Sequence, residues 1–380
     1  MAVDASRVRS GGGIAHIMGV LDITDPTQFG IDEIHVWAYE RLLKKLPDRT
    51  WLVKHHPPEL ELSLFHQLYW QGAKLAREIK ASDCQILFSV DASTVCRFKP
   101  MVVLSQNMLA YEDGVLALFG WGRDRIQQTL MLHVQKKAFK AAQASIFLTE
   151  HSARRIQRKI GELSQTTCIA HGVGDIFKKI EHKPSWPLDN NRPIKCLYVS
   201  PILEYKHQCE VVQAIRILRD QGHNIKLTLV GGGGGRATSM LTRQLKISDP
   251  EGEFVECLEF LPTEQVANLL SRADLFIFAS SCETFGIALL EAMAVGLPIA
   301  CSSRSSLPES LQDAGEYFDP QNINSIVRAL ERLIENPEVR DFYSSRAKEL
   351  ASSYSWESCA RETWQFVVRC YRTVSALERK

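Results

Sequence analysis

Short apolar runs alternate with longer segments of helical periodicity along the whole chain. The short runs are rich in Val, Ile, Leu and Phe and predict buried strands, and the segments between them place apolar residues on one helical face. This alternation predicts repeated β-α-β units and mostly parallel sheets, so the fold class is α/β. The expected strands are residues 2–8, 34–37, 51–54, 86–90, 102–105, 145–148 and 167–170 in the first half, and 195–200, 226–230, 254–257, 275–279 and 298–301 in the second.

The segment between these two series of strands is typical of a linker. Residues 178–192 (KKIEHKPSWPLDNNR) hold two prolines and polar clusters with little periodicity. A chain of 380 residues is also long enough to bury two separate cores. We therefore predict an N-terminal domain over residues 1–178, a linker over 179–193, a C-terminal domain over 194–355 and a terminal helix within 356–380.

Composition excludes several classes of protein. Lys plus Arg (45) nearly balances Asp plus Glu (44), so we expect no nucleic-acid partner. No apolar run approaches the roughly 20 residues that span a bilayer, and Met1 is followed by Asp4 and Arg7 without an apolar signal core. The ten cysteines are scattered without a C-x-x-C pair, which favours reduced, buried thiols over disulfides or a metal site. We expect a cytoplasmic protein.

The most informative segment is residues 279–298, ASSCETFGIALLEAMAVGLP. It follows an expected strand, forms a turn at Glu283–Gly286 and continues as a helix over Ile287–Val295 that ends at a Gly and a Pro. In an open α/β sheet, ligands bind where a strand leads into a helix N-terminus, because unpaired N–H groups and the helix dipole attract an anion there. Glu283 and Glu291 could both face such a site, and sugar or ribose hydroxyls are suitable partners for carboxylates. The alternative is a turn residue and a solvated helix charge.

The residues Glu283-Thr284-Phe285-Gly286, followed by Glu291-Ala292-Met293-Ala294-x-Gly296-x-Pro298, resemble the signature of glycosyltransferase family four. Further landmarks fit in order: Gly11–Gly13, His171-Gly172-Val173, Leu229–Gly232, Leu307-Pro308-Glu309 and Tyr354–Glu357. The resemblance is closer in the C-terminal half. It implies the GT-B fold, in which two doubly wound, Rossmann-like domains face each other across a cleft, and a retaining transfer of sugar from a nucleotide sugar.

The resemblance also implies roles for the signature residues. Glu283 would bind the donor sugar and Glu291 the ribose. The backbone N–H groups that would meet sugar and diphosphate oxygens are those of Phe285, Gly286 and Ile287.

Lys206 lies where the family has a lysine that contacts the diphosphate. A fixed cation there would stabilise the negative charge that grows on the leaving group. Two departures matter: Pro201 replaces an arginine usual in the family, and Gln106 follows a central strand where a histidine is common. Arg236 could supply the second cation, although a surface arginine is the more usual state of such a residue.

In the first half, the loop around Gly12 and Gly13 ends the first strand and opens a helix, so its backbone could approach the diphosphate. The spacing G-x-G-x-x-G is absent there, which disfavours a nicotinamide enzyme. His16 lies one turn into that helix and is more often a packing residue than a base.

No metal-ligand cluster is evident, so we expect a metal-independent enzyme. The resemblance implies a nucleotide sugar as co-substrate, GDP-mannose or a UDP-sugar, with no other cofactor. The expected acceptor is a glycan or lipid-linked glycan of surface polysaccharide biosynthesis. Basic residues between His133 and Lys159 could bind the inner face of a membrane, or could belong to two solvated helix faces. Two other functions stay open: a sugar-nucleotide epimerase of the same fold, and a catalytically silent binding or assembly subunit.

Overall fold

The computed structural model describes all residues except 10, 181–185, 188–191 and 379–380, and it contains two compact units. The N-terminal unit comprises residues 1–116, 120–172 and 355–380, and the C-terminal unit comprises residues 117–119 and 173–354. Most of the predicted linker falls outside the described residues. The C-terminal segment from Ser355 onward belongs to the N-terminal unit.

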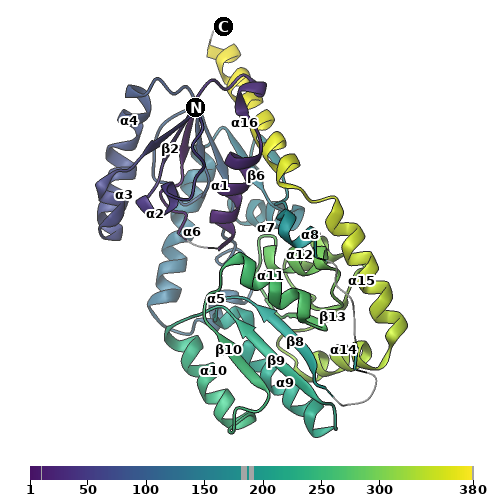
Figure 1. The fold of residues 1–380 in the computed structure, drawn as a ribbon. Helices are drawn as coiled ribbons and strands as arrows, with labels where there is room; N and C mark the ends of the chain where they lie inside the picture. The colour runs from purple at the N-terminus through teal and green to yellow at the C-terminus, as the bar shows by residue number, and fades with distance from the viewer. Residues whose placement is uncertain (10, 181–185, 188–191, 379–380) are drawn as a thin grey trace. The chain divides into compact units, whose positions relative to one another are not determined.

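The N-terminal unit is a seven-stranded parallel sheet in the order β3-β2-β1-β4-β5-β6-β7, with helices packed against it (Figure 1). Its five inner strands are fully or largely buried, which explains their apolar runs, whereas the edge strands β3 and β7 are more exposed. The strands are β1 (Ala2–Asp4), β2 (Ile34–Trp37), β3 (Leu52–His55), β4 (Leu87–Ser89), β5 (Met101–Leu104), β6 (Ala144–Phe147) and β7 (Thr166–Cys168). The helices are α1 (Gly11–Ile23), η1 (Pro26–Phe29), α2 (Glu40–Leu43), η2 (Pro58–Glu61), α3 (Leu64–Ala73), α4 (Leu75–Ala81), α6 (Arg123–Ala141), α7 (Glu150–Ile160), α16 (Trp356–Glu378) and the first half of α5 (Val115–Leu118), whose last two residues belong to the C-terminal unit.

The C-terminal unit is a six-stranded parallel sheet in the order β10-β9-β8-β11-β12-β13. Its strands are β8 (Ile194–Val199), β9 (Ile225–Val230), β10 (Val255–Leu258), β11 (Leu275–Phe278), β12 (Ile299–Ser302) and β13 (Glu316–Phe318). Its helices are α8 (Asp175–Lys178), η3 (Glu204–Lys206), α9 (Gln208–Asp220), α10 (Gly235–Ser248), α11 (Thr263–Arg272), α12 (Ile287–Val295), α13 (Leu307–Leu311), α14 (Ile323–Glu335) and α15 (Pro337–Ser352). The strand order reverses between β8 and β11, and such a switch point is where α/β sheets bind ligands.

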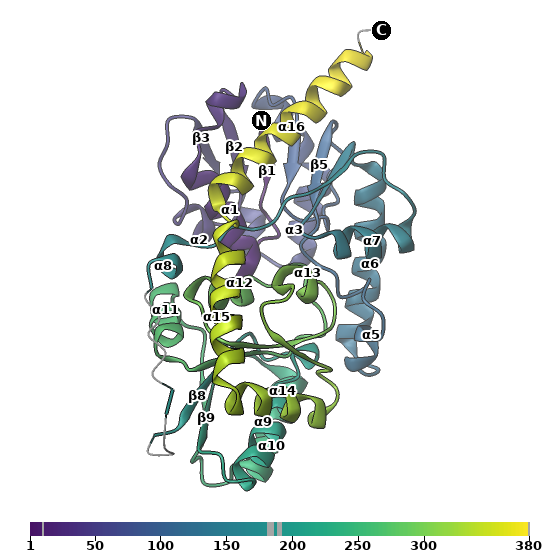
Figure 2. The same ribbon diagram turned by 90° about the vertical axis from the view of Figure 1, so that its right-hand side faces the viewer.

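Helix α16 packs along α1 within the N-terminal unit (Figure 2). A Cβ atom on Gly19 of α1 would lie 2.3 Å from the ring of Trp356, so only glycine allows this approach. Trp364 is fully buried and its indole N–H donates to the hydroxyl of Thr24 at 3.1 Å. The apolar spacing of the terminal segment is therefore explained by its packing on α1.

The α/β fold class with two Rossmann-like units is confirmed, and each predicted strand overlaps an observed one. Three details were wrong. The first strand ends at Asp4 instead of residue 8, and Gly11–Gly13 form the first turn of α1 rather than a loop. The short edge strand β13 (Glu-Tyr-Phe) was not predicted, because three residues carry too little alternation to be recognised.

Candidate functional site

The family signature lies at the carboxyl edge of the C-terminal sheet. β11 leads through residues 279–286 into α12, which begins at Ile287 and ends at Val295 as predicted. Gly286 precedes α12 with φ 93°, a left-handed conformation that favours glycine. Phe285 is buried and packs edge-to-face against Tyr354 with ring centroids 5.6 Å apart. The first N–H groups of a helix have no intrahelical acceptor, so the start of α12 can bind an anion.

Lys206 lies at the same edge, on the neighbouring strand's connection. It ends η3, between β8 and α9, and β8 pairs directly with β11. The hydroxyl of Tyr198 donates to the Lys206 carbonyl at 2.6 Å, and the Lys206 ammonium lies 5.2 Å from the Tyr205 ring centroid and 5.5 Å from that of Phe278. These contacts fix a lysine that is only 6% exposed.

The Lys206 ammonium and the Glu283 carboxylate form an ion pair. Both side chains are largely shielded from solvent, at 8% and 15% exposure. Because each charge is partly desolvated, removing one would leave the other uncompensated. The sequence predicted that both residues bind the donor, and the structure brings them together.

Glu291 is the only ionisable residue of α12, whose other side chains are apolar and mostly buried. Among the described residues, no hydrogen bond or ion pair to its carboxylate is present. Burial raises the pKa of Glu291 to about 8 from an ordinary value of 4.5. At neutral pH this carboxyl group is therefore largely protonated until a partner stabilises its charge.

Gly12 and Gly13 lie in the first turn of α1, in the N-terminal unit. A Cβ atom on Gly13 would lie 3.0 Å from the side-chain oxygen of Gln106, whose amide donates to the Val90 carbonyl at 2.9 Å. Gln106 and the glycines are thus neighbours. The approach of Gly12 and Gly13 to a diphosphate stays a prediction.

His16 is a buried packing residue, as predicted from the sequence. Its Nδ1 lies 3.3 Å from Nδ1 of His171, and both rings pack against Trp356. Burial lowers the pKa of His16 to about 3 and holds the pKa of His171 well below its ordinary value. Both imidazoles are therefore neutral in the folded protein.

Pro201, which replaces the arginine usual in the family, and Arg236, the candidate second cation, both lie on the surface. Pro201 is exposed, and Arg236 is an exposed residue of α10 whose guanidinium donates to the Leu118 carbonyl at 3.1 Å. In its observed conformation Arg236 does not contact the Lys206–Glu283 pair.

The sequence missed three residues that hold this pair. His207 follows Lys206 and its Nε2 lies 3.0 Å from the Ser281 hydroxyl, while Ser305 and Ser306 bond the Glu283 backbone. No residue-type signal marks serines in a loop, but the positive φ of His207 (54°) and Ser305 (60°) marks both positions in the structure.

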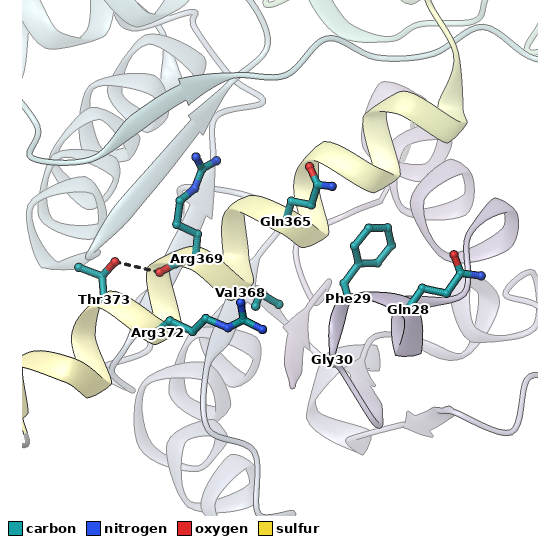
Figure 3. Close-up of a pocket in the computed structure, with 8 residues that line it drawn as sticks. All are labelled: Gln28, Phe29, Gly30, Gln365, Val368, Arg369, Arg372 and Thr373. Carbon is teal, nitrogen blue, oxygen red and sulfur yellow. Dashed lines mark hydrogen bonds between the residues drawn. The ribbon is translucent and has the colours of Figure 1, made fainter.

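A surface pocket lies elsewhere, in the N-terminal unit between η1 and α16 (Figure 3). Its lining includes Phe29, Gln365, Arg369 and Arg372. It shares no residue with the predicted site.

Three further properties concern the described residues alone. They contain no group of three or more His, Cys, Asp or Glu side chains arranged to hold a metal ion. None of their helices is long and apolar enough to cross a membrane. All ten cysteines fall within this part of the chain and are free thiols.

Residues 179–350, which include β8 to α14 and nearly all of α15, match the family described as glycosyl transferases group 1. The chain carries a group 1 glycosyltransferase domain. It is 28% identical over 167 residues to O-antigen chain mannosyltransferase B of Escherichia coli, covering 44% of each chain. The chain thus matches less than half the length of this relative.

Solved structures share the fold of the whole chain. Sucrose-phosphate synthase of Thermosynechococcus elongatus superimposes with a TM-score of 0.76 and 17% identity over 99% of both chains. Anabaena HepE in complex with UDP-glucose gives a TM-score of 0.70 and 16% identity over 99% of both chains. The glycosyltransferase domain therefore lies within a GT-B architecture: the predicted fold is confirmed, and the predicted family is confirmed for residues 179–350.

Proposed function

We propose that this protein transfers a sugar from a nucleotide sugar to a hydroxyl group of a glycan or lipid-linked acceptor, with retention of configuration and without a metal ion. The observation that carries the proposal is the buried Lys206–Glu283 pair beside the N-terminus of α12. A cation, a carboxylate and a helix N-terminus at one sheet edge suit a diphosphate attached to a polyhydroxyl group.

In the proposed reaction, the bond between the anomeric carbon and the diphosphate oxygen breaks and the acceptor oxygen bonds to the anomeric carbon on the same face. The acceptor's proton passes to the departing diphosphate. Lys206 stabilises the charge that develops on that oxygen, and this interaction is stronger in the transition state than in the ground state. Glu283 orients the sugar through its hydroxyl groups, and Glu291 accepts hydrogen bonds from the ribose.

The comparisons support two donor classes. One relative is a mannosyltransferase of O-antigen chains, and one structural neighbour was solved with UDP-glucose. We propose GDP-mannose or a UDP-sugar as donor, and a surface polysaccharide intermediate as acceptor.

A thermal-shift screen followed by a transfer assay tests this function. UDP, GDP, UDP-glucose and GDP-mannose are added separately, and the cognate nucleotide should raise the melting temperature because it binds only the folded state. The product's anomeric configuration is then determined by NMR. Transfer is also measured for Glu283→Ala, and Glu256→Ala on exposed β10 is its control. An inverted product would refute retention.

The same assay separates the two other functions. Conversion of the donor to an isomer without acceptor would indicate an epimerase. Tight nucleotide binding with no turnover on any acceptor would indicate a silent subunit. Pro201 and Gln106 would explain such a loss, because they stand where the family usually has an arginine and a histidine.

We also propose peripheral binding at the inner face of the membrane through α6. This helix exposes Ile126 (64%) and Leu130 (62%), and exposed Lys136, Lys137 and Lys140 follow. Such a combination suits anionic lipid. The protein should co-sediment with phosphatidylglycerol vesicles but not with phosphatidylcholine vesicles. A Lys136→Glu/Lys137→Glu variant should lose this binding. Equal binding to both lipids would contradict an electrostatic contribution to membrane binding.

Among the basic residues of α7, Arg155 contributes less to this surface. It forms ion pairs with Glu112 and Asp113 at 2.9 and 2.7 Å, so its charge is balanced within the fold. Arg154 and Arg158 of α7 are exposed, and the membrane proposal is tested on α6 because that helix also exposes apolar side chains.

A further inference from the structure

The loop after β12 contains a strained serine beside the ion pair. Ser305 has φ 60°, in the left-handed region that glycine adopts readily and other residues rarely do. Within the described residues of the C-terminal unit, the other non-glycine residues with positive φ are His207 and Gln312. Two of these three residues thus adjoin Lys206 or Glu283, and strained backbone is often retained where function requires a fixed geometry.

The Ser305 hydroxyl explains why this position is not glycine. It accepts a hydrogen bond from the Glu283 N–H at 3.1 Å and lies 3.0 Å from the Glu283 carbonyl oxygen, to which it donates. One side chain therefore holds both polar backbone groups of the residue that bears the carboxylate. A glycine would adopt the same backbone without strain but would leave both groups without this partner.

Two further serines hold the same turn. The hydroxyl of Ser306, a fully buried residue, donates to the Glu283 carbonyl at 2.8 Å, and that of Ser310 donates to the Phe285 carbonyl at 3.2 Å. The turn that connects β11 to α12 is thus fixed from outside by hydroxyl groups of the β12–α13 segment. We call Ser305, Ser306 and Ser310 the serine clamp.

We propose that Ser305 is a positioning residue that holds Glu283 in place for the donor sugar, a role that rests on the proposed function. Without donor, the Glu283 carboxylate is held by Lys206. When the sugar binds, the carboxylate has to turn from the ammonium to a sugar hydroxyl while its backbone stays in place. The serine clamp keeps the backbone fixed during this exchange, and small displacements of a positioning group reduce catalysis strongly.

Ser305→Gly tests the clamp, because glycine removes the hydroxyl and tolerates the backbone conformation. Gln312→Gly is the matched control: Gln312 has φ 52° and is in the same unit, but it does not belong to the clamp. Ser305→Ala is the second variant, which removes the hydroxyl and keeps the strain. Melting temperature, amide hydrogen exchange, binding of UDP, GDP, UDP-glucose and GDP-mannose, and steady-state kinetics are measured for each.

We expect Ser305→Gly to melt at the wild-type temperature or above it, and to bind nucleoside diphosphate within about twofold of wild type. Exchange of the Glu283 amide, which loses its acceptor, and of the following Thr284–Gly286 amides should accelerate. The nucleotide sugar should lose more affinity than the nucleoside diphosphate. The kcat should drop by about tenfold, which corresponds to the loss of one or two hydrogen bonds. Ser305→Ala should show the same kcat with a lower melting temperature, and Gln312→Gly should leave kcat unchanged.

If amide exchange and kcat were unchanged in Ser305→Gly, the positioning role of the serine clamp would be refuted. Sugar transfer by the wild-type protein would still support the proposed function in that case. An equal loss of nucleoside diphosphate and nucleotide-sugar binding would assign Ser305 a structural role only, and would also overturn the proposal. If the wild-type protein bound none of the four nucleotides, the proposed function itself would fail, and the positioning role with it.

Discussion

Glu291 should make the ligand-free protein less stable at neutral pH than a variant that cannot ionise there. Burial raises the pKa of its carboxyl to about 8 in the folded protein, against 4.5 for an ordinary glutamate. A raised pKa means that the folded state binds the proton more tightly than the unfolded chain. Its contribution to stability is therefore complete below pH 4.5 and is lost as the pH rises towards 8. Glu291→Gln stays neutral throughout and should avoid this loss.

The size of the effect follows from the pKa difference. Each pH unit between the two values costs about 1.4 kcal/mol, so at pH 7 the wild-type protein should be less stable than the variant by about 3 kcal/mol. This figure is an upper limit because Glu291 remains partly accessible to solvent. For a unit of the size of the C-terminal unit, the melting temperature of Glu291→Gln should exceed that of the wild type by roughly 2–4 °C per kcal/mol of added stability.

Urea unfolding followed by circular dichroism at pH 5 and pH 7.5 measures this difference, with Glu256→Gln on exposed β10 as the control. Glu291→Gln should exceed wild type in stability at pH 7.5 and differ little at pH 5, while binding nucleoside diphosphate more weakly. If the two proteins showed the same pH dependence, the argument that burial perturbs Glu291 would be refuted.

Lys206→Ala should lower turnover far more than donor affinity, because the ammonium acts on charge that develops as the diphosphate leaves; near-full turnover at saturating donor would remove Lys206 from the mechanism. Transfer should survive EDTA, and strict dependence on added magnesium or manganese would contradict the metal-free proposal. By calorimetry, Glu291→Ala should weaken nucleoside diphosphate binding by about 1.5–3 kcal/mol while Glu283→Ala should not, and equal losses would misplace the sugar. Since the pKa of His16 falls to about 3 in the folded state, wild type should lose about 1.4 kcal/mol per pH unit below 6.5 through this residue. The free energy of unfolding should therefore fall less steeply with decreasing pH in His16→Gln than in the wild type. An unchanged slope would refute the argument that His16 is buried in its neutral form.

The family signature could be read from the sequence because its information is local. The turn at residues 283–286, the helix from Ile287 to Val295 and its end at Gly296 follow from residue type and spacing along one continuous segment. The same holds for the strands, whose buried runs in parallel sheets are apolar on both faces. Family membership and fold class were therefore predictable.

The ion pair, the protonation of Glu291 and the serine clamp depend on the tertiary structure. Lys206 and Glu283 are 77 residues apart, and they meet only because β8 and β11 are neighbours in the sheet. The pKa of Glu291 depends on the side chains that surround α12, and no sequence pattern reports that desolvation. The positioning role of Ser305 rests on its positive φ and on its hydrogen bonds to Glu283, which lies 22 positions away in the sequence. Residue types and their spacing thus predict which segments form the candidate site. Which charges and hydroxyl groups interact there depends on the fold, because electrostatic and hydrogen-bond energies depend on distances in space.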